Sequence, residues 1–269
     1  MSRLLNGAEL AGFIKERQAK QVRALRQAYG IFPRLAIVTD SDNPVIATYM
    51  RLKQQYGADI LIDVEIHRVQ PDELLTVVRE LNERQDIQGI IVQLPLEQKE
   101  QTDNVLATVS PEKDVDGLHP HTTFDAATPM AIQWLLAGHN IELSGKRIAI
   151  VGRGRLVGGP LERIWRNSGL NVTVFEKGDN LSALEDYEII VTATGVAGLI
   201  DSDVVRPSAI VVDAGTASEQ GKIVGDVTPA LRQRDDITIT PEKGGVGPLT
   251  VTALFDNVIT ACFRIANKK

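Results

Sequence analysis

The chain has 269 residues, enough for one large domain or two ordinary ones. Its 29 Lys and Arg against 35 Asp and Glu give a net charge of −6, which argues against a nucleic-acid or anionic-membrane partner. Cys262 is the only cysteine, so an intrachain disulfide and a thiolate metal cluster are excluded. The first residues lack a signal peptide's apolar stretch, and no apolar run approaches the ~18 residues of a membrane span, so we expect a cytoplasmic protein.

Hydrophobic periodicity predicts alternating helices and strands along the first half of the chain. Helices are expected over 8–28, from about 44 to 56, and from 71 onward. Strands are expected over 34–39, 60–69 and 88–93. Gly57 is expected to end the second helix. Strands and helices that alternate at this spacing form right-handed crossovers and therefore a parallel sheet.

An aperiodic stretch between Pro111 and Thr128, rich in Asp, His, Thr and Pro, predicts a domain junction. The alternation then restarts. Strands are expected over 146–151, 171–175, 189–193 and 209–213, and helices near 129–139 and over 156–168 and 249–266. The sequence therefore predicts two α/β units in tandem.

A glycine-rich turn follows the strand that ends at Val151. Gly152, Gly154 and Gly158 allow a tight turn and the close approach of a diphosphate to the amides that begin the next helix. Glu176 ends the following strand, near the ~20-residue offset at which an acid binds a ribose hydroxyl. The strand, the glycines, the helix and the acid together predict a dinucleotide site. The glycines alone equally fit a plain turn, and their spacing is one residue longer than the usual fingerprint.

Polar side chains that suit proton transfer stand in the first half of the chain. Tyr49 and Lys53 are four residues apart and share one face of the predicted helix, where spacing alone favours a solvated lysine beside a half-buried tyrosine. In a cleft, the pair would polarise a substrate and carry a proton. Gln93 stands at the end of a parallel strand, where α/β sheets bind ligands, and Leu94 and Pro95 then redirect the chain through a bond that can be cis.

Two loop motifs complete the set of candidates. Asp114 and Asp116 suit the amine edge of a heterocycle or a metal, but no matching histidine pair or third acid is evident, and turn formation is the simpler interpretation. The cluster from Gly244 to Pro248 lets backbone pass close to a flat ligand or acts as a hinge, with Thr250 as a cap of the last helix. The four histidines lack metal-ligand spacing, so no metal site is expected.

Taken in order, these segments resemble the bifunctional methylenetetrahydrofolate dehydrogenase/methenyltetrahydrofolate cyclohydrolase family over nearly the whole chain. The most specific strings are Gln-Leu-Pro at 93–95, Lys-Asp-Val-Asp-Gly at 113–117 and Gly-Gly-Val-Gly-Pro at 244–248. The resemblance implies a folate-binding catalytic domain with a parallel sheet over 1–125 and 249–269, and a Rossmann-type NAD(P)-binding domain over 126–248. It also implies that the C-terminal helix returns to the first domain and that the protein is a homodimer.

The implied activity is oxidation of 5,10-methylenetetrahydrofolate to the methenyl form with NADP or NAD, followed by hydrolysis to 10-formyltetrahydrofolate. The alternatives are a monofunctional dehydrogenase, a dehydrogenase for a related one-carbon carrier, and a nucleotide-sensing regulator on the same scaffold. The retained Lys53 speaks against the regulator. NADP is the family default; Glu176 repels a 2′-phosphate and favours NAD, while Arg153 and Lys177 support NADP.

The resemblance also assigns roles to residues. Lys53 would donate and accept protons, Gln93 would hydrogen-bond it, Tyr49 would pack on the aminobenzoyl ring and Asp116 would bind the amino edge of the pterin. Further substrate contacts are expected from Val92, Leu94, Lys243, Gly244, Gly245, Val246, Gly247 and Pro248. Cofactor contacts are expected from Gly152, Arg153, Gly154, Leu156, Val157, Gly158, Glu176, Lys177, Thr194 and Thr216.

Overall fold

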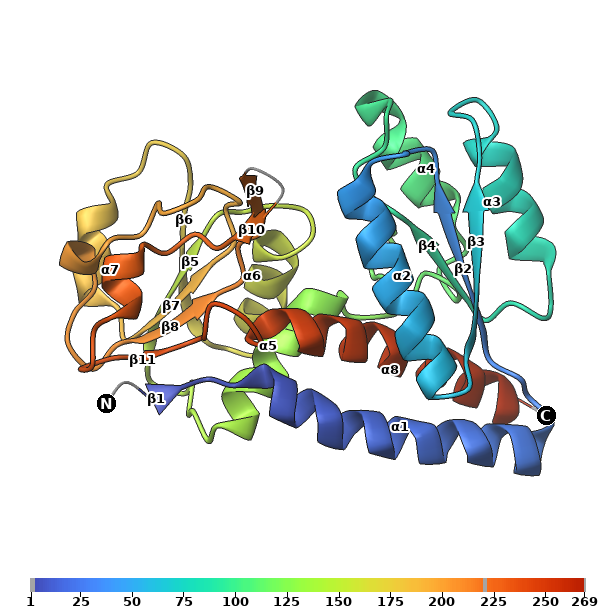
Figure 1. The fold of residues 1–269 in the computed structure, drawn as a ribbon, viewed down its shortest axis with the longest axis horizontal. Helices are drawn as coiled ribbons and strands as arrows, with labels where there is room; N and C mark the ends of the chain where they lie inside the picture. Colours follow the sequence, from blue (N-terminus) through green and yellow to red (C-terminus); the bar gives the residue numbers. More distant parts are fainter. Residues whose placement is uncertain (1–2, 220–221, 269) are drawn as a thin grey trace. The chain divides into compact units, whose positions relative to one another are not determined.

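The computed structural model describes residues 3–219 and 222–268, and the chain divides into two compact α/β units (Figure 1). The six-strand unit comprises residues 1–11 and 128–250, and the three-strand unit comprises residues 12–127 and 251–269. The chain passes from one unit to the other within helix α1 (Gly7–Tyr29), at the start of α5 (Ala127–Gly138) and within α8 (Val246–Ala266). Two helices are therefore common to both units.

The three-strand unit is built on a parallel sheet of order β3-β2-β4. Its strands are β2 (Arg34–Thr39), β3 (Asp63–Arg68) and β4 (Gly89–Val92). The central strand β2 and its neighbour β4 are almost wholly buried, as expected for a parallel sheet covered on both faces. Its helices are α2 (Pro44–Asp59), α3 (Leu74–Glu83) and α4 (Thr102–Thr108).

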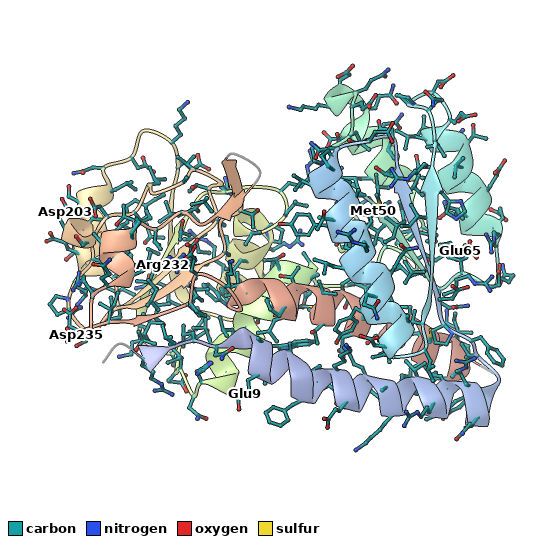
Figure 2. The ribbon with its side chains drawn as sticks, viewed as in Figure 1. Glu9, Met50, Glu65, Asp203, Arg232 and Asp235 are labelled. Atoms are coloured by element: carbon teal, nitrogen blue, oxygen red, sulfur yellow. The ribbon has the colours of Figure 1, made fainter. Side chains whose placement is uncertain are left out.

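Alternate residues of these strands face two different helix layers. Ala36, Val38 and Ile90 share a buried cluster with the apolar residues of α3 and α4. On α2, Met50 is fully buried, and the helix lies on the other side of the strands from α3 (Figures 1 and 2). The sheet is thereby fixed between helices, and the carboxyl ends of its strands are left to present polar residues.

The C-terminal helix packs within the three-strand unit, which confirms the prediction that it returns to the first domain. Gln18 of α1 donates to the Thr252 carbonyl oxygen of α8 at 2.9 Å, and Arg17 pairs with Asp256 at 2.7 Å. Asn257 donates to the carbonyl oxygens of Val115 and Asp125, both at 2.9 Å. The helix therefore ties the loop around Val115 to the body of the unit.

By length and composition, α8 is apolar enough to cross a membrane, which corrects the expectation that no apolar segment reaches that length. The polar residues Thr252, Asp256 and Asn257 interrupt the run and hide it from a search for unbroken apolar stretches. Of its most apolar window, 61% is buried inside the protein, so α8 serves as a core helix.

The six-strand unit contains a parallel sheet of order β1-β11-β8-β7-β5-β6. Its strands are β1 (Arg3–Leu4), β5 (Arg147–Val151), β6 (Asn171–Phe175), β7 (Ile189–Thr192), β8 (Ile210–Asp213) and β11 (Thr238–Ile239). Helix α6 (Gly158–Asn167) follows β5, and helix α7 (Pro229–Arg232) precedes β11. Strand β9 (Ala217–Glu219) pairs antiparallel with β10 (Lys222–Val224). Strands β6 and β7 lie on opposite sides of β5, so the strand order reverses there. Doubly wound sheets bind ligands at such a reversal, here at the carboxyl ends of β5 and β7.

The predicted two-unit α/β class is confirmed, and the boundaries differ at particular residues. Helix α2 continues past Gly57 to Asp59; a Cβ at position 57 would lie 2.6 Å from the Val64 side chain, so this glycine serves packing and does not end the helix. The next strand begins at Asp63, later than expected, because Leu61 turns with a φ of 66°. Helix α8 begins at Val246 and includes Pro248 in its first turn, where a missing N–H is tolerated.

Replacing Asn257 with Ala is expected to lower the free energy of unfolding by about 2 kcal/mol, because one buried and one partly buried carbonyl oxygen lose their donor. Urea unfolding measures the change. The matched control is Ile265→Ala on the same helix, whose side chain is 38% exposed and should lose less. Equal losses in the two variants would contradict the assigned anchoring role.

Candidate functional site

In the three-strand unit, helix α2 places Tyr49 and Lys53 on one face. The helix begins at Pro44, and the Asn43 side chain accepts from the Val45 N–H, so the start of the helix is fixed. The half-buried Lys53 donates from Nζ to Oε1 of Gln93 at 2.9 Å. The structure therefore brings together two of the predicted residues from different elements.

Two further hydrogen bonds fix Gln93, one from its backbone and one from its side chain. Its backbone N–H donates to the Val38 carbonyl oxygen at 2.8 Å, which continues the ladder just beyond β4. Its side-chain Nε2 donates to the Leu94 carbonyl oxygen at 3.1 Å, and the Leu94–Pro95 bond is cis. Because the amide nitrogen already has an acceptor, the oxygen is the atom that faces Lys53.

The loop that carries Asp116 is fastened beside β4. The Lys113 carbonyl oxygen accepts from the Ile90 N–H at 2.7 Å, and Lys113 Nζ donates to three carbonyl oxygens at the end of α3: those of Leu81, Asn82 and Arg84. A cation suits the carbonyl end of a helix. Sequence reasoning missed this role, although a lysine directly before the acid pair was visible as a signal.

Asp114 braces the same loop. Its side chain is buried and accepts from the His119 N–H at 2.8 Å, so it holds the turn from within. Asp116 is half-buried. Of the predicted acid pair, one carboxylate therefore supports the loop and the other remains available near Lys53.

Burial governs the electrostatics of these groups. It lowers the pKa of Lys53, and the Asp116 charge opposes that shift. Burial likewise raises the pKa of Asp116, opposed by Lys53 and reinforced by Asp114. The pKa of Tyr49 is raised by burial too. An amine with a lowered pKa exchanges its proton closer to neutral pH, which is what general acid–base chemistry requires.

The apolar candidates in this region differ in exposure. Val92 lies in the core against α3 and α4, so its side chain does not reach solvent, whereas Leu94 is half-buried. Leu52, which sequence reasoning missed, is 53% exposed between Tyr49 and Lys53 on α2. The signal in the sequence was a leucine three positions after Tyr49, on the helix face that carries Tyr49 and Lys53.

In the six-strand unit, the turn after β5 leaves no room for a side chain at two of its glycines, Gly152 and Gly158. Gly152 has a φ of 94°, and a Cβ there would lie 2.7 Å from the Ala193 carbonyl oxygen. A Cβ on Gly158 would lie 1.8 Å from the Gly152 carbonyl oxygen. Over Gly154 the space is open, and the first turn of α6 contains no acid. This cradle fits a diphosphate, because close backbone approach and the positive end of a helix are both present.

Beside the cradle, Arg153 lies among carboxylates. Its Nε is 2.8 Å from Glu162, and its guanidinium is 3.9 Å from the Glu176 carboxylate. Glu162 also pairs with Arg166 at 3.0 Å. These side chains and Asp179 line an open hollow of about 380 Å³. Leu156, Val157 and Lys177 lie on the connections that flank it, and Leu156 and Lys177 are exposed.

The remaining predicted residues lie after β7, after β8 and at the start of α8 in the six-strand unit. Thr194 and Thr216 follow β7 and β8, at the carboxyl edge of the sheet. Lys243, Gly244 and Gly245 precede α8, and Val246, Gly247 and Pro248 form its first turn. The Gly244 carbonyl oxygen accepts from the N–H groups of Gly7 and Ala8 at 2.8 and 2.9 Å, so this segment is anchored to the start of α1.

A doubly wound parallel sheet with a glycine cradle is typical of an NAD(P)-binding unit, and a half-buried lysine hydrogen-bonded to a fixed amide is a candidate acid–base group in the other unit. The class that fold and site define is therefore a dinucleotide-binding α/β protein with a candidate acid–base site. Known proteins narrow this class to one family.

Residues 5–116 match the catalytic domain of tetrahydrofolate dehydrogenase/cyclohydrolase, and residues 126–266 match its NAD(P)-binding domain. The bifunctional protein FolD of Exiguobacterium sp. is 34% identical over 98% of this chain and 100% of its own. The crystal structure of the bifunctional enzyme FolD from Campylobacter jejuni has a TM-score of 0.92 and 32% identity, covering 98% of this chain and 100% of that one. The Trypanosoma brucei enzyme complexed with NADP cofactor and inhibitor has a TM-score of 0.91 and 29% identity, with 98% of each chain covered.

The chain thus belongs to the bifunctional FolD family of methylenetetrahydrofolate dehydrogenase/cyclohydrolases, as its motifs predict. It is an oxidoreductase and hydrolase of folate one-carbon metabolism with an NAD(P)-binding domain.

Replacing Gln93 with Glu is expected to raise the pKa of Lys53, because a carboxylate would accept the ammonium hydrogen bond in place of a neutral amide. A higher pKa leaves less neutral amine at a given pH. The rising limb of the cyclohydrolase pH–rate profile should therefore move upward by about one pH unit, with a lower rate at neutral pH.

The control is Gln54→Glu, which adds the same charge on an exposed position of α2. Its pH profile should stay close to that of the wild type. A profile unchanged by Gln93→Glu would count against control of the Lys53 proton by this hydrogen bond.

Proposed function

We propose that Lys53 moves the protons in hydrolysis of 5,10-methenyltetrahydrofolate to 10-formyltetrahydrofolate, and that the same enzyme first forms the methenyl compound from 5,10-methylenetetrahydrofolate with NAD(P)⁺. One observation carries the proposal: a half-buried ammonium of lowered pKa donates at 2.9 Å to an amide whose orientation is fixed. The monofunctional alternative gains no support, since Lys53, Gln93 and Asp116 are all present and Lys53 is bonded to Gln93.

Hydrolysis requires water to add to the methenyl carbon and a ring C–N bond to break. The neutral amine of Lys53 accepts a proton from the attacking water, and the ammonium then returns a proton to the departing nitrogen, while the remaining hydroxyl proton passes to solvent as the formyl C=O forms. Gln93 holds Nζ in place through both steps, because its oxygen accepts from either protonation state. The Asp116 charge keeps the pKa of Lys53 from falling further, so the returning proton remains available.

The folate is proposed to lie against α2 and the Asp116 loop of the three-strand unit. Tyr49 and the exposed Leu52 offer an aromatic and an apolar surface for the aminobenzoyl ring. Asp116 offers two acceptor oxygens to the amino edge of the pterin, and Lys113 keeps its loop in place through α3.

The glycine cradle of the six-strand unit is proposed to bind the diphosphate of NAD(P). When bound, the dinucleotide supplies the hydride acceptor of the reaction. Gly152 and Gly158 let the backbone close tightly, and the start of α6 would present the positive end of the helix to the anion. The nitrogen lone pair of the folate expels the hydride, so the task of the protein is orientation, with Thr194 and Thr216 at the edge near the nicotinamide.

We further propose that NAD⁺ is accepted alongside NADP⁺, because Glu176 lowers the affinity for a 2′-phosphate. Arg153, the cation best placed for that phosphate, already lies beside Glu162 and Glu176. The Glu176 side chain is 59% exposed, so its carboxylate can meet ribose hydroxyls. A 2′-phosphate would have to displace one carboxylate and approach the other.

Lys53→Met is expected to lower cyclohydrolase turnover by about a hundredfold or more, because the variant keeps the bulk of the side chain and loses its proton. Dehydrogenase activity should stay within about tenfold of the wild type, since orientation carries that step. The two half-reactions are assayed separately, with exposed Lys20→Met of α1 as the control. Wild-type hydrolysis by the Lys53 variant would defeat the assignment.

Glu176→Ser is expected to raise the ratio of kcat/KM for NADP⁺ to that for NAD⁺ by about tenfold, because it removes like-charge repulsion and one of the two carboxylates beside Arg153. Glu185→Ser removes the same charge from an exposed site in the same unit and should leave the ratio unchanged. A ratio that moves equally in both variants would reflect net charge and not this contact.

A further inference from the structure

Four side chains meet where strands β7 and β8 end in the six-strand unit. We call Thr192, Asp213, Asp226 and Arg232 the strand-end network. Thr192 and Asp213 are the last residues of β7 and β8, and Arg232 is the last residue of α7 (Figure 2).

Asp226 is the centre of this network. Its side chain is completely buried. Its Oδ2 accepts from the Thr192 hydroxyl and, at 2.6 Å, from the Thr194 N–H. Its own backbone N–H donates to Asp213 Oδ1 at 3.0 Å. Asp226 Oδ1 is buried with no hydrogen-bond partner among the residues that the structure describes.

Asp213 connects the next loop and the next strand. Its Oδ1 also accepts from the Gly215 N–H at 3.1 Å, while its Oδ2 pairs with Arg232. Arg232 in turn donates to the Thr240 carbonyl oxygen at 2.8 Å, just beyond β11. One network thus fastens the segments that follow three neighbouring strands.

Two carboxylates are buried here, and the Arg232 guanidinium pairs with that of Asp213, which is an expensive arrangement for stability alone. Apolar side chains would hold the strand ends together at lower cost. Carboxylates do something that apolar side chains cannot: they accept the N–H groups of Thr194 and Gly215, which belong to the loops after β7 and β8. Those loops lie at the edge where a doubly wound sheet binds a dinucleotide.

The loops are also drawn in closely. A Cβ on Gly215 would lie 2.0 Å from Asp226 Oδ1, and a Cβ on Gly225 would lie 2.0 Å from Asp213 Oδ2. Only glycine allows the backbone to pass this near to the carboxylates. The network therefore sets the position of both loops and leaves little room for alternative arrangements.

We propose that Asp226 is a positioning residue for the dehydrogenase reaction, holding the loops that carry Thr194 and Thr216 in the arrangement that receives the nicotinamide end of NAD(P). This inference rests on the proposed function of those two loops. Asp226 acts through them and does not itself touch the dinucleotide, because it is completely buried.

The test is Asp226→Asn in the full chain, an exchange that keeps the shape of the side chain and removes its charge. Titration with NAD⁺ is expected to show a Kd raised by about tenfold, and the dehydrogenase KM for NAD⁺ should rise with it. The cyclohydrolase rate should stay within about threefold of the wild type, because Lys53 and Gln93 lie in the three-strand unit.

Thr192→Val is the second variant and serves if Asp226→Asn does not fold; it removes one donor to Asp226 and should raise the Kd in the same direction. Thr238→Val, in β11 of the same sheet, is the matched control. NAD⁺ affinity equal to the wild type in both variants would overturn the proposal, as would a parallel fall of both activities. A wild-type chain that binds NAD⁺ without oxidising the folate would instead refute the proposed function, and the NAD⁺ titration would still report on the network.

Discussion

The hydrogen bond from Lys53 to Gln93 is the interaction on which the proposed proton transfer in the three-strand unit depends. An ammonium removed from water loses solvation, and that loss lowers its pKa; a fixed acceptor and a nearby carboxylate keep the charged form within reach. Both partners are placed by larger elements: Lys53 by α2, and Gln93 by the end of β4. The sheet and its covering helices thus supply an environment in which one amine can exchange protons.

The two units solve different problems with different parts of the chain. The three-strand unit presents side chains, each held by a second group: Gln93 by the Leu94 carbonyl oxygen, and the Asp116 loop by Lys113. The six-strand unit presents mostly backbone, through a glycine cradle and through loops whose N–H groups donate to buried carboxylates. Proton transfer needs a tuned side chain, whereas binding and orienting a dinucleotide needs a rigid surface of amides.

Periodicity predicted most of the fold, because buried strands and amphipathic helices leave strong repeating patterns. It failed where tertiary packing decides. Gly57 lies inside a helix because the Val64 side chain leaves no room for a Cβ, and Pro248 is accepted in the first turn of α8. The strands β1 and β11 have two residues each, too few for any pattern to emerge.

The candidate site was predictable where a local motif marks the residue, as with Lys53 on its helix and Gln93 at the end of its strand. It was not predictable where the function of a residue depends on distant partners. Lys113 acts on carbonyl oxygens about thirty positions earlier in the chain, and Asp226 acts on Thr192 and Thr194. Such contacts follow from topology, which places segments far apart in sequence at the same strand ends.

The division of the chain inside α1 and α8 has a consequence for inheritance and engineering. No flexible linker separates the two units at these places, so a recombination event that exchanged one of them would have to cut two helices in mid-course. A fragment ending at residue 127 would lose Asn257 and with it the donor to the Val115 and Asp125 carbonyl oxygens. The two halves are therefore expected to be inherited together, as one module that resists shuffling.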